Sequence, residues 1–182
     1  MDVPVQNDQA ARTEAMRGHQ KLTAAATTNP MPGTVLRKEE PLSVDGRPVV
    51  LFVCVKNGGK SQMAGALMRH LAGGSIDVRT AGTKPGNGLN AQSVQSLSEL
   101  GIEIGDERPK PITRELLAGV DLVITLGREA ELEPIPGTRM RNWDIDEPSP
   151  RGIDGMERMR LVRDDIRARA TRLLGELNAA AR

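Results

Sequence analysis

The sequence is poor in cysteine and in aromatic residues: its 182 residues include one cysteine, one tryptophan, one phenylalanine and no tyrosine. One cysteine excludes an intramolecular disulfide and a zinc site built from several thiolates, and we expect no metal. The shortage of rings argues against a face on which single-stranded nucleic acid stacks its bases. The formal net charge of +1 supplies no broad electrostatic field, so an anionic ligand must be bound by local groups.

Long apolar segments are also absent from the sequence. No run approaches the roughly 18 apolar residues of a transmembrane helix, and the first residues lack the apolar core of a secretory signal. We therefore expect a cytoplasmic protein. Residues 1–48 show no sustained periodicity, which predicts a mobile N-terminal extension with a short helix near residues 9–26. Residues 49–182 would then form the folded domain.

From Val49 onward, apolar residues follow regular patterns. The uninterrupted run at residues 49–53 is typical of a parallel strand buried on both faces. Three shorter apolar segments predict further strands, at residues 78–81, 121–126 and 138–143. Apolar residues at steps of three or four predict three helices, over residues 63–71, 94–100 and 159–177. The alternation predicts an α/β fold with a small parallel four-stranded sheet and helices on both faces, with ligands at the carboxyl ends of the strands.

The segment VLFVCVKNGGKSQMA, residues 50–64, allows two interpretations. Its Gly59-Lys60-Ser61 triplet matches the end of the nucleotide-binding pattern G-x-x-x-x-G-K-[ST]. That pattern, however, needs glycine where this chain has Cys54. It also needs a second strand that ends in aspartate to hold magnesium, whereas the strand at residues 121–126 is followed by Gly127. These departures argue against nucleotide hydrolysis.

The second interpretation is a thiol beside an oxyanion-binding loop. A free cysteine at a strand end is most often a small buried apolar residue, but three neighbouring features favour the thiolate over the thiol. Gly58 and Gly59 permit the positive φ angles of an anion-binding nest, and the helix that begins near Ser61 adds its positive end. Lys60 adds full charge, and the Ser61 hydroxyl can donate to the sulfur. The candidates for oxyanion binding are Val55, Lys56, Asn57, Gly58, Gly59 and Lys60.

This loop resembles the active-site loop of the low-molecular-weight protein tyrosine phosphatase superfamily, and within it the arsenate reductases of that fold. Cys54, Asn57, Lys60 and Ser61 occupy the positions of the family pattern. The resemblance extends over residues 49–177 and includes two further turns, Ala81-Gly82-Thr83 and Lys110-Pro111-Ile112. The family's loop cation is normally arginine, which binds oxyanions through a planar fork. Lysine cannot make that bidentate contact, so we expect weak phosphatase activity.

The resemblance also implies an acid near the end of the chain. Phosphatases of this fold protonate the leaving oxygen with an aspartate that precedes a proline. Here Glu147 stands next to Pro148, while Asp146, one residue earlier, keeps the family's residue type. Either can be the acid, and the alternative for both is a solvated acidic turn.

A single cysteine restricts the source of electrons. Related arsenate reductases that use thioredoxin pass electrons through further cysteines and an internal disulfide, which this chain cannot form. A small thiol co-substrate is therefore implied, and the closest resemblance is to actinobacterial enzymes that transfer arsenate to mycothiol in arsenic detoxification, with a mycoredoxin reducing the adduct. The sequence leaves open whether Cys54 bonds to arsenic or only positions it. Two alternatives remain: a phosphomonoesterase or tyrosine phosphatase with a weakened loop, and a non-catalytic oxyanion-binding module.

Several other polar or sulfur-containing residues are interpreted as structural or as surface residues. His70 is expected on a helix surface, and His19 falls in the extension. Met156 and Met159 belong to the apolar stripe of the last helix. The remaining three are cations expected on the surface: Arg128, Arg151 and Arg158.

Overall fold

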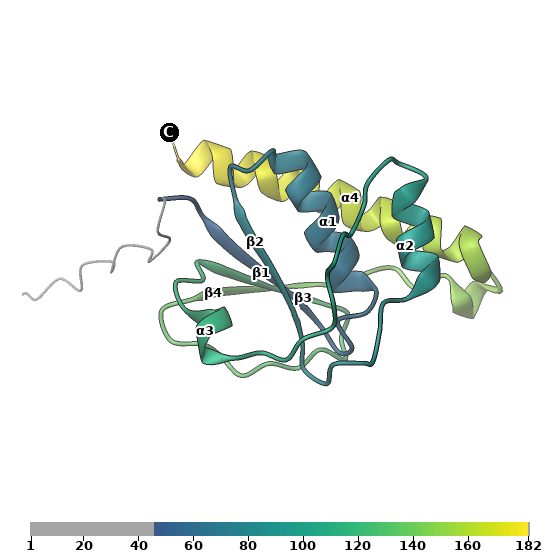
Figure 1. Ribbon diagram of the computed structural model, residues 1–182, viewed down its shortest axis with the longest axis horizontal. Helices are drawn as coiled ribbons and strands as arrows, with labels where there is room; N and C mark the ends of the chain where they lie inside the picture. Colours follow the sequence, from purple (N-terminus) through teal and green to yellow (C-terminus); the bar gives the residue numbers. More distant parts are fainter. Residues whose placement is uncertain (1–45, 182) are drawn as a thin grey trace, which may run out of the picture. The chain divides into compact units, whose positions relative to one another are not determined.

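The computed structural model describes residues 46–181 (Figure 1). The extension and its short helix near residues 9–26 lie outside the described residues, so these expectations remain untested. Within residues 46–181, four strands form one fully parallel sheet of order β2-β1-β3-β4. The strands are β1 (Val49–Cys54), β2 (Asp77–Gly82), β3 (Leu122–Leu126) and β4 (Arg139–Trp143). The predicted α/β fold and its four strands are confirmed, with bounds that shift by one residue.

Three helices cover one face of the sheet: α1 (Lys60–Ala72), α2 (Ala91–Ser98) and α4 (Gly155–Ala180). The helix α4 packs against α1 and α2, and α1 also contacts β1 and β2. Among residues 46–181, the opposite face carries α3 (Arg114–Leu117) and loops. The sequence analysis missed α3 because four residues are too few to show a helical period.

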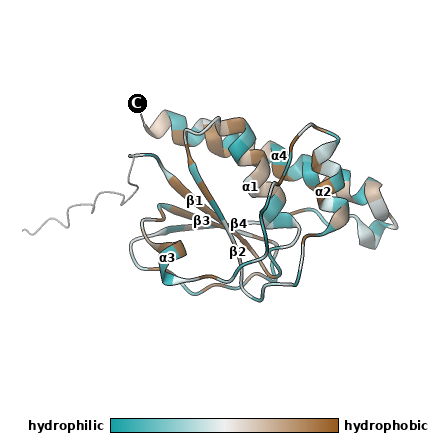
Figure 2. Ribbon diagram, in the orientation of Figure 1, coloured by the Kyte–Doolittle hydropathy of each residue, from teal (hydrophilic) through white to brown (hydrophobic). Residues whose placement is uncertain are grey.

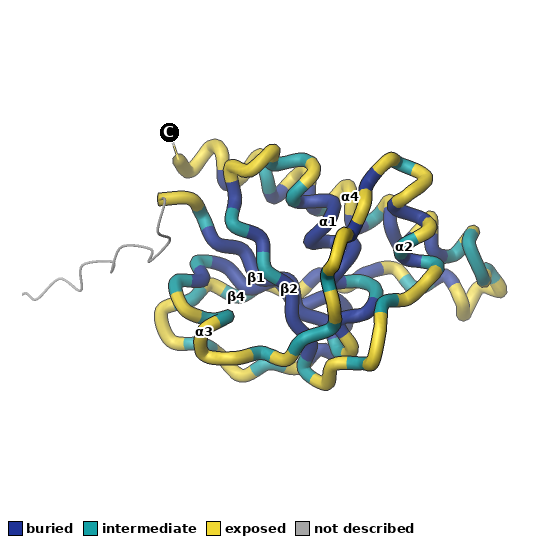
Figure 3. Tube along the Cα trace, in the orientation of Figure 1, coloured by how far each residue is buried: buried dark blue, intermediate teal, exposed yellow. Residues whose placement is uncertain are grey.

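The two central strands, β1 and β3, do not alternate between apolar and polar residues. Every residue of β1 and of β3 is buried, since apolar side chains pack on both faces (Figures 2 and 3). Val50 and Phe52 join the cluster under the three helices, whereas Leu51 and Val53 join the cluster toward α3. Phe52 and Trp143, the two aromatic residues of the chain, pack together with ring centroids 5.5 Å apart. This buried packing positions the end of β1, where Cys54 stands.

Within residues 46–181, no helix combines the length and the apolarity needed to cross a membrane.

Candidate functional site

The site lies at the carboxyl edge of the sheet, where the loop after β1 turns into α1. Cys54 is the last residue of β1 and pairs in register with Gly82, the last residue of β2. Its side chain is buried, and the Sγ atom lies 3.0 Å from the Ser61 hydroxyl oxygen. The backbone N–H of Asn57 donates to the same sulfur at 3.2 Å. The sulfur thus lies within hydrogen-bond distance of a hydroxyl group and of a backbone N–H at the end of the strand.

Asn57 holds this arrangement together. It is fully buried, and its side-chain amide donates to the Ser61 hydroxyl oxygen at 2.8 Å. Because that oxygen already accepts from Asn57, the hydroxyl hydrogen is free to point at the Cys54 sulfur. The Asn57 carbonyl oxygen accepts from the backbone N–H of Lys110 at 3.0 Å and from the Gln62 amide at 3.3 Å. The turn at residues 110–112 therefore has a structural role in the site.

The predicted backbone conformation of the loop is wrong in one respect. Gly58 and Gly59 are not among the residues with positive φ; the left-handed residue is Asn57, with φ of 50°. Asparagine tolerates this conformation better than other residues with a side chain. Gly58 is instead required by space, since a Cβ atom there would lie 2.8 Å from the backbone oxygen of Gly88.

The loop's carbonyl groups face away from the sulfur because the next segment binds them. Four carbonyls of residues 54–58 accept hydrogen bonds from the segment 83–90: Thr83 to Cys54, Lys84 to Val55, Gly86 to Lys56 and Asn90 to Gly58, at 2.7–3.1 Å. The backbone N–H groups of Lys56, Gly58, Gly59, Lys60 and Ser61 donate to no acceptor within residues 46–181. Free N–H groups in one loop and at a helix N-terminus form an anion-binding site.

Crowding at Gly58 leads to a stability prediction. We expect Gly58→Ala to lower the free energy of unfolding by about 1–3 kcal/mol, because the backbone of Gly88 must move away. Gly88→Ala is the matched control, since no atom lies within 4 Å of a Cβ built there. Urea unfolding measures both. Equal stability of the two variants would show that the segment 83–90 does not press on the loop.

The ammonium group of Lys60 lies beside the predicted acid. Its Nζ atom is 3.6 Å from Oε2 of Glu147. Arg158 binds the same carboxylate through two hydrogen bonds, of 2.5 and 2.9 Å. Asp146 points elsewhere and forms a bidentate pair with Arg151 at 2.6 and 2.8 Å. Of the two candidate acids, Glu147 is therefore the one in contact with the loop cation.

The two candidate acids are ionised in this arrangement. Hydrogen bonding to Arg158 lowers the pKa of Glu147 below its ordinary value of 4.5. Hydrogen bonding to Arg151 likewise lowers the pKa of Asp146 below 3.8. Neither carboxyl stores a proton for a leaving oxygen at neutral pH, so the role of general acid stays a prediction for both.

These ion pairs predict that the folded chain loses stability at acid pH. A carboxylate whose pKa is lower in the folded chain stabilises the fold above its unfolded value, and this contribution disappears as the pH falls through the folded value. We expect Glu147→Gln to melt at a lower temperature than the wild type at pH 7, and the difference to shrink as the pH falls below 4.5. Glu133→Gln, which removes an exposed carboxylate without an ion pair among the described residues, is the control. A difference that stays constant as the pH falls below 4.5 would contradict the ion-pair account.

Arg158 is the residue that the sequence analysis missed. It was expected to be an exposed cation. Instead, its contact with Glu147 leaves it half-buried, and it lines a cavity beside the loop. The helical position of Arg158 does not reveal this contact, because its partner Glu147 lies on a loop eleven residues earlier. Met159 is buried as expected and lines the same cavity. The other three residues expected on the surface are exposed: His70, Arg128 and Arg151.

Comparisons with known proteins agree with this geometry. A putative arsenate reductase of Halobacterium salinarum is 31% identical over 147 residues, which cover 75% of this chain and 98% of that protein. An arsenate reductase of Halalkalibacterium halodurans is 34% identical over 126 residues, covering 66% of this chain and 90% of that protein.

Solved structures of arsenate reductases also share the fold. The thioredoxin-dependent arsenate reductase of Corynebacterium glutamicum superposes with a TM-score of 0.63 at 33% identity, over 74% of this chain and 63% of that one. This chain thus spans just under two thirds of the Corynebacterium protein. An arsenate reductase in a phosphate-binding state gives a TM-score of 0.61 at 25% identity, over 71% of this chain and 98% of that one.

The family expected from the loop is confirmed by a match that covers most of the chain. Residues 49–182 match the family described as low molecular weight phosphotyrosine protein phosphatase. With its cysteine at the end of β1 and the loop of free N–H groups that follows, this chain belongs to the low molecular weight phosphotyrosine protein phosphatase family.

Proposed function

We propose that this protein is a thiol-dependent arsenate reductase. The observation that carries the proposal is the Cys54 sulfur, which accepts a hydrogen bond from the Asn57 N–H and lies 3.0 Å from the Ser61 hydroxyl oxygen. It stands at the start of a loop in which several N–H groups have no acceptor within residues 46–181. Such a loop suits a tetrahedral oxyanion, and an arsenate reductase of this fold has been solved in a phosphate-binding state. The arsenate reductases of two other organisms, more than 30% identical to this chain, support arsenate as the oxyanion.

In the proposed reaction, the Cys54 thiolate bonds to arsenic while one arsenate hydroxyl takes a proton from solvent and leaves as water. The unpaired N–H groups and Lys60 bind the remaining oxygens, which carry the negative charge. The thiolate RS⁻ of a co-substrate thiol then displaces Cys54, giving RS–AsO3H⁻ and the free Cys54 thiolate. A second thiol R′SH attacks the sulfur of this adduct and yields RSSR′ and arsenite. Arsenic changes from the pentavalent to the trivalent state only in this last step, as two sulfurs are oxidised.

We propose mycothiol as the co-substrate and a mycoredoxin as the second thiol. The support is the cysteine count, since one cysteine cannot form the internal disulfide of a relay. The Corynebacterium relative is described as thioredoxin-dependent, so thioredoxin is the alternative reductant to test. No step in this scheme uses a metal, and residues 46–181 contain no cluster of three potential ligands.

The direct experiment measures the arsenite formed from arsenate, together with the affinity of the protein for arsenate and for phosphate. We expect arsenite production with mycothiol and mycoredoxin, and competitive inhibition by phosphate because the loop binds both tetrahedral anions. Binding of arsenate by calorimetry, without turnover under any thiol, would instead support the non-catalytic binding module.

The loop cation separates a reductase from a phosphatase. We expect Lys60→Arg to raise the hydrolysis of p-nitrophenyl phosphate by about tenfold, since a planar fork binds two equatorial oxygens of the transferring phosphoryl group. Lys60→Met is the control and should lower it. Strong hydrolysis by the wild type, lost in Cys54→Ser, would favour the phosphatase and contradict our proposal.

A further inference from the structure

Two cavities flank Lys60, and they differ in charge. The first, of about 640 Å³, is lined by four cations and no carboxylate: Lys56, Lys60, Lys84 and Arg158. The second, of about 530 Å³, is lined by five carboxylates and three cations. Lys60 is the residue that lines both cavities. An anion approaching the loop is therefore attracted to the first cavity and repelled from the second.

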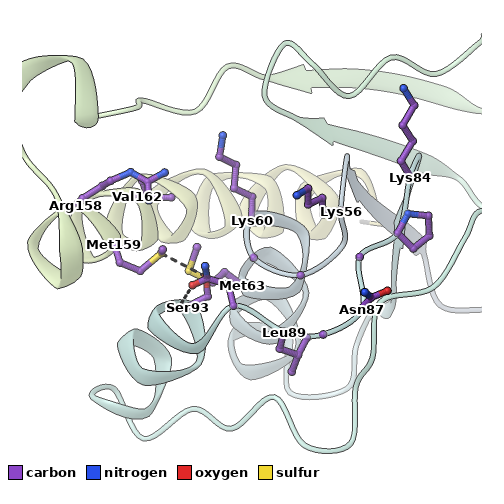
Figure 4. Close-up of a pocket in the computed structure, with 16 residues that line it drawn as sticks. Lys56, Lys60, Met63, Lys84, Asn87, Leu89, Ser93, Arg158, Met159 and Val162 are labelled. Atoms are coloured by element: carbon purple, nitrogen blue, oxygen red, sulfur yellow. Dashed lines mark hydrogen bonds between the residues drawn. The ribbon is translucent and has the colours of Figure 1, made fainter.

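Two of the four cations in the first cavity are uncompensated. Arg158 is neutralised by Glu147, and Lys60 lies 3.6 Å from the same carboxylate. Lys56 and Lys84 form no ion pair or hydrogen bond through their ammonium groups within residues 46–181. They belong to the two segments joined by backbone hydrogen bonds, and Figure 4 shows Lys56 between Lys60 and Lys84. Their positions are thus fixed by the same bonds that shape the loop.

The rest of the lining suits a ligand of small-molecule size. Met63, Met159 and Leu89 also line the cavity and in Figure 4 lie apart from the lysine ammonium groups, and Ser93 donates to the Met159 sulfur. Apolar walls strengthen the attraction between a cation and an anion because they exclude water. The cavity volume falls within the range of about 300–1,000 Å³ usual for small-molecule sites. Gly58 and Gly59 form one wall, so the cavity adjoins the oxyanion loop.

We propose that this cavity binds the co-substrate thiol of the reaction as its thiolate, with Lys56 and Lys84 supplying the countercharge. The proposal rests on the arsenate reductase function proposed above. The thiolate forms a bond to arsenic as the bond from Cys54 to arsenic breaks, and Cys54 leaves as a thiolate. No electrons are transferred to arsenic in this step. Because a free thiol with a pKa of about 8.5 is mostly protonated at pH 7, binding must release a proton.

Calorimetry with mycothiol, without arsenate, tests this site independently of turnover. Titrations at pH 7 in two buffers with different ionisation enthalpies give the number of protons released. We expect the wild type to release a large fraction of a proton per mycothiol bound, and S-methylated mycothiol to release none. Lys84→Gln should bind mycothiol about fivefold more weakly and release fewer protons. The control Arg139→Gln removes an exposed cation on β4, outside both cavities, and should match the wild type.

The outcomes separate this site from the proposed function. Mycothiol binding without proton release, binding by Lys84→Gln equal to that of the wild type, or no binding at all would overturn the site. Arsenite formation with mycothiol would still uphold the function in those cases. Proton-linked binding in a protein that forms no arsenite would uphold the site and overturn the function.

Discussion

Cys54→Ser is expected to lose arsenate reduction by about a thousandfold or more, to the limit of detection. The Cys54 sulfur is the nucleophile of the proposed reaction, and the serine hydroxyl that replaces it is not ionised at neutral pH. The chain contains no second cysteine that could take over. The measurement is the rate of arsenite formation with saturating thiol.

Arsenate binding and the melting temperature of Cys54→Ser test whether the loop keeps its structure after the substitution. The serine Oγ can still accept from the Asn57 N–H and the Ser61 hydroxyl, which bond to sulfur in the wild type. We therefore expect arsenate binding and the melting temperature to stay close to those of the wild type. Turnover by Cys54→Ser within tenfold of the wild type would mean that the co-substrate thiol attacks arsenate directly and that Cys54 only positions it.

Asn57→Ala is expected to have the largest effect on stability. It leaves the part-buried Lys110 N–H without its acceptor, removes the hydrogen bond that orients Ser61, and places alanine at a φ of 50°. Together these changes should lower the free energy of unfolding by about 3–5 kcal/mol. Arsenate turnover should fall as well, because the Ser61 hydroxyl is no longer held with its hydrogen toward the sulfur. Urea unfolding and arsenite formation measure the two effects.

Asn57→Gly separates the two causes of this loss. Glycine lacks the same hydrogen bonds but adopts positive φ without strain. We expect it to be more stable than Asn57→Ala by about 1 kcal/mol while losing a similar share of activity. An alanine variant as stable as the wild type would show that the side-chain network of Asn57 does not support the loop.

The sheet could be predicted because its strands leave strong patterns. The runs that became β1 and β3 are buried on both faces, and a continuous apolar segment of five or six residues fits that environment. The position of Cys54 at the sheet's ligand edge then followed from the topology. The helix α3 could not be predicted in this way because its four residues form a single turn, which is too short to show a helical period.

The detailed geometry of the site was harder to predict because it depends on contacts between distant segments. The glycines after Asn57 suggested left-handed residues, yet Gly58 is small because Gly88 lies against it. Likewise, sequence alone could not tell which of Asp146 and Glu147 contacts Lys60. The two carboxylates pair with Arg151 and Arg158, and the chain gives no local sign of either pair.

The central claim is that Cys54 passes arsenate to an external small thiol and forms no internal disulfide. The most direct test follows arsenate-dependent NADPH oxidation in two coupled systems, one with mycothiol, mycoredoxin and mycothione reductase, the other with thioredoxin and thioredoxin reductase. The account predicts turnover only in the mycothiol system, and none there with Cys54→Ser. Turnover with thioredoxin in the absence of any small thiol would contradict it.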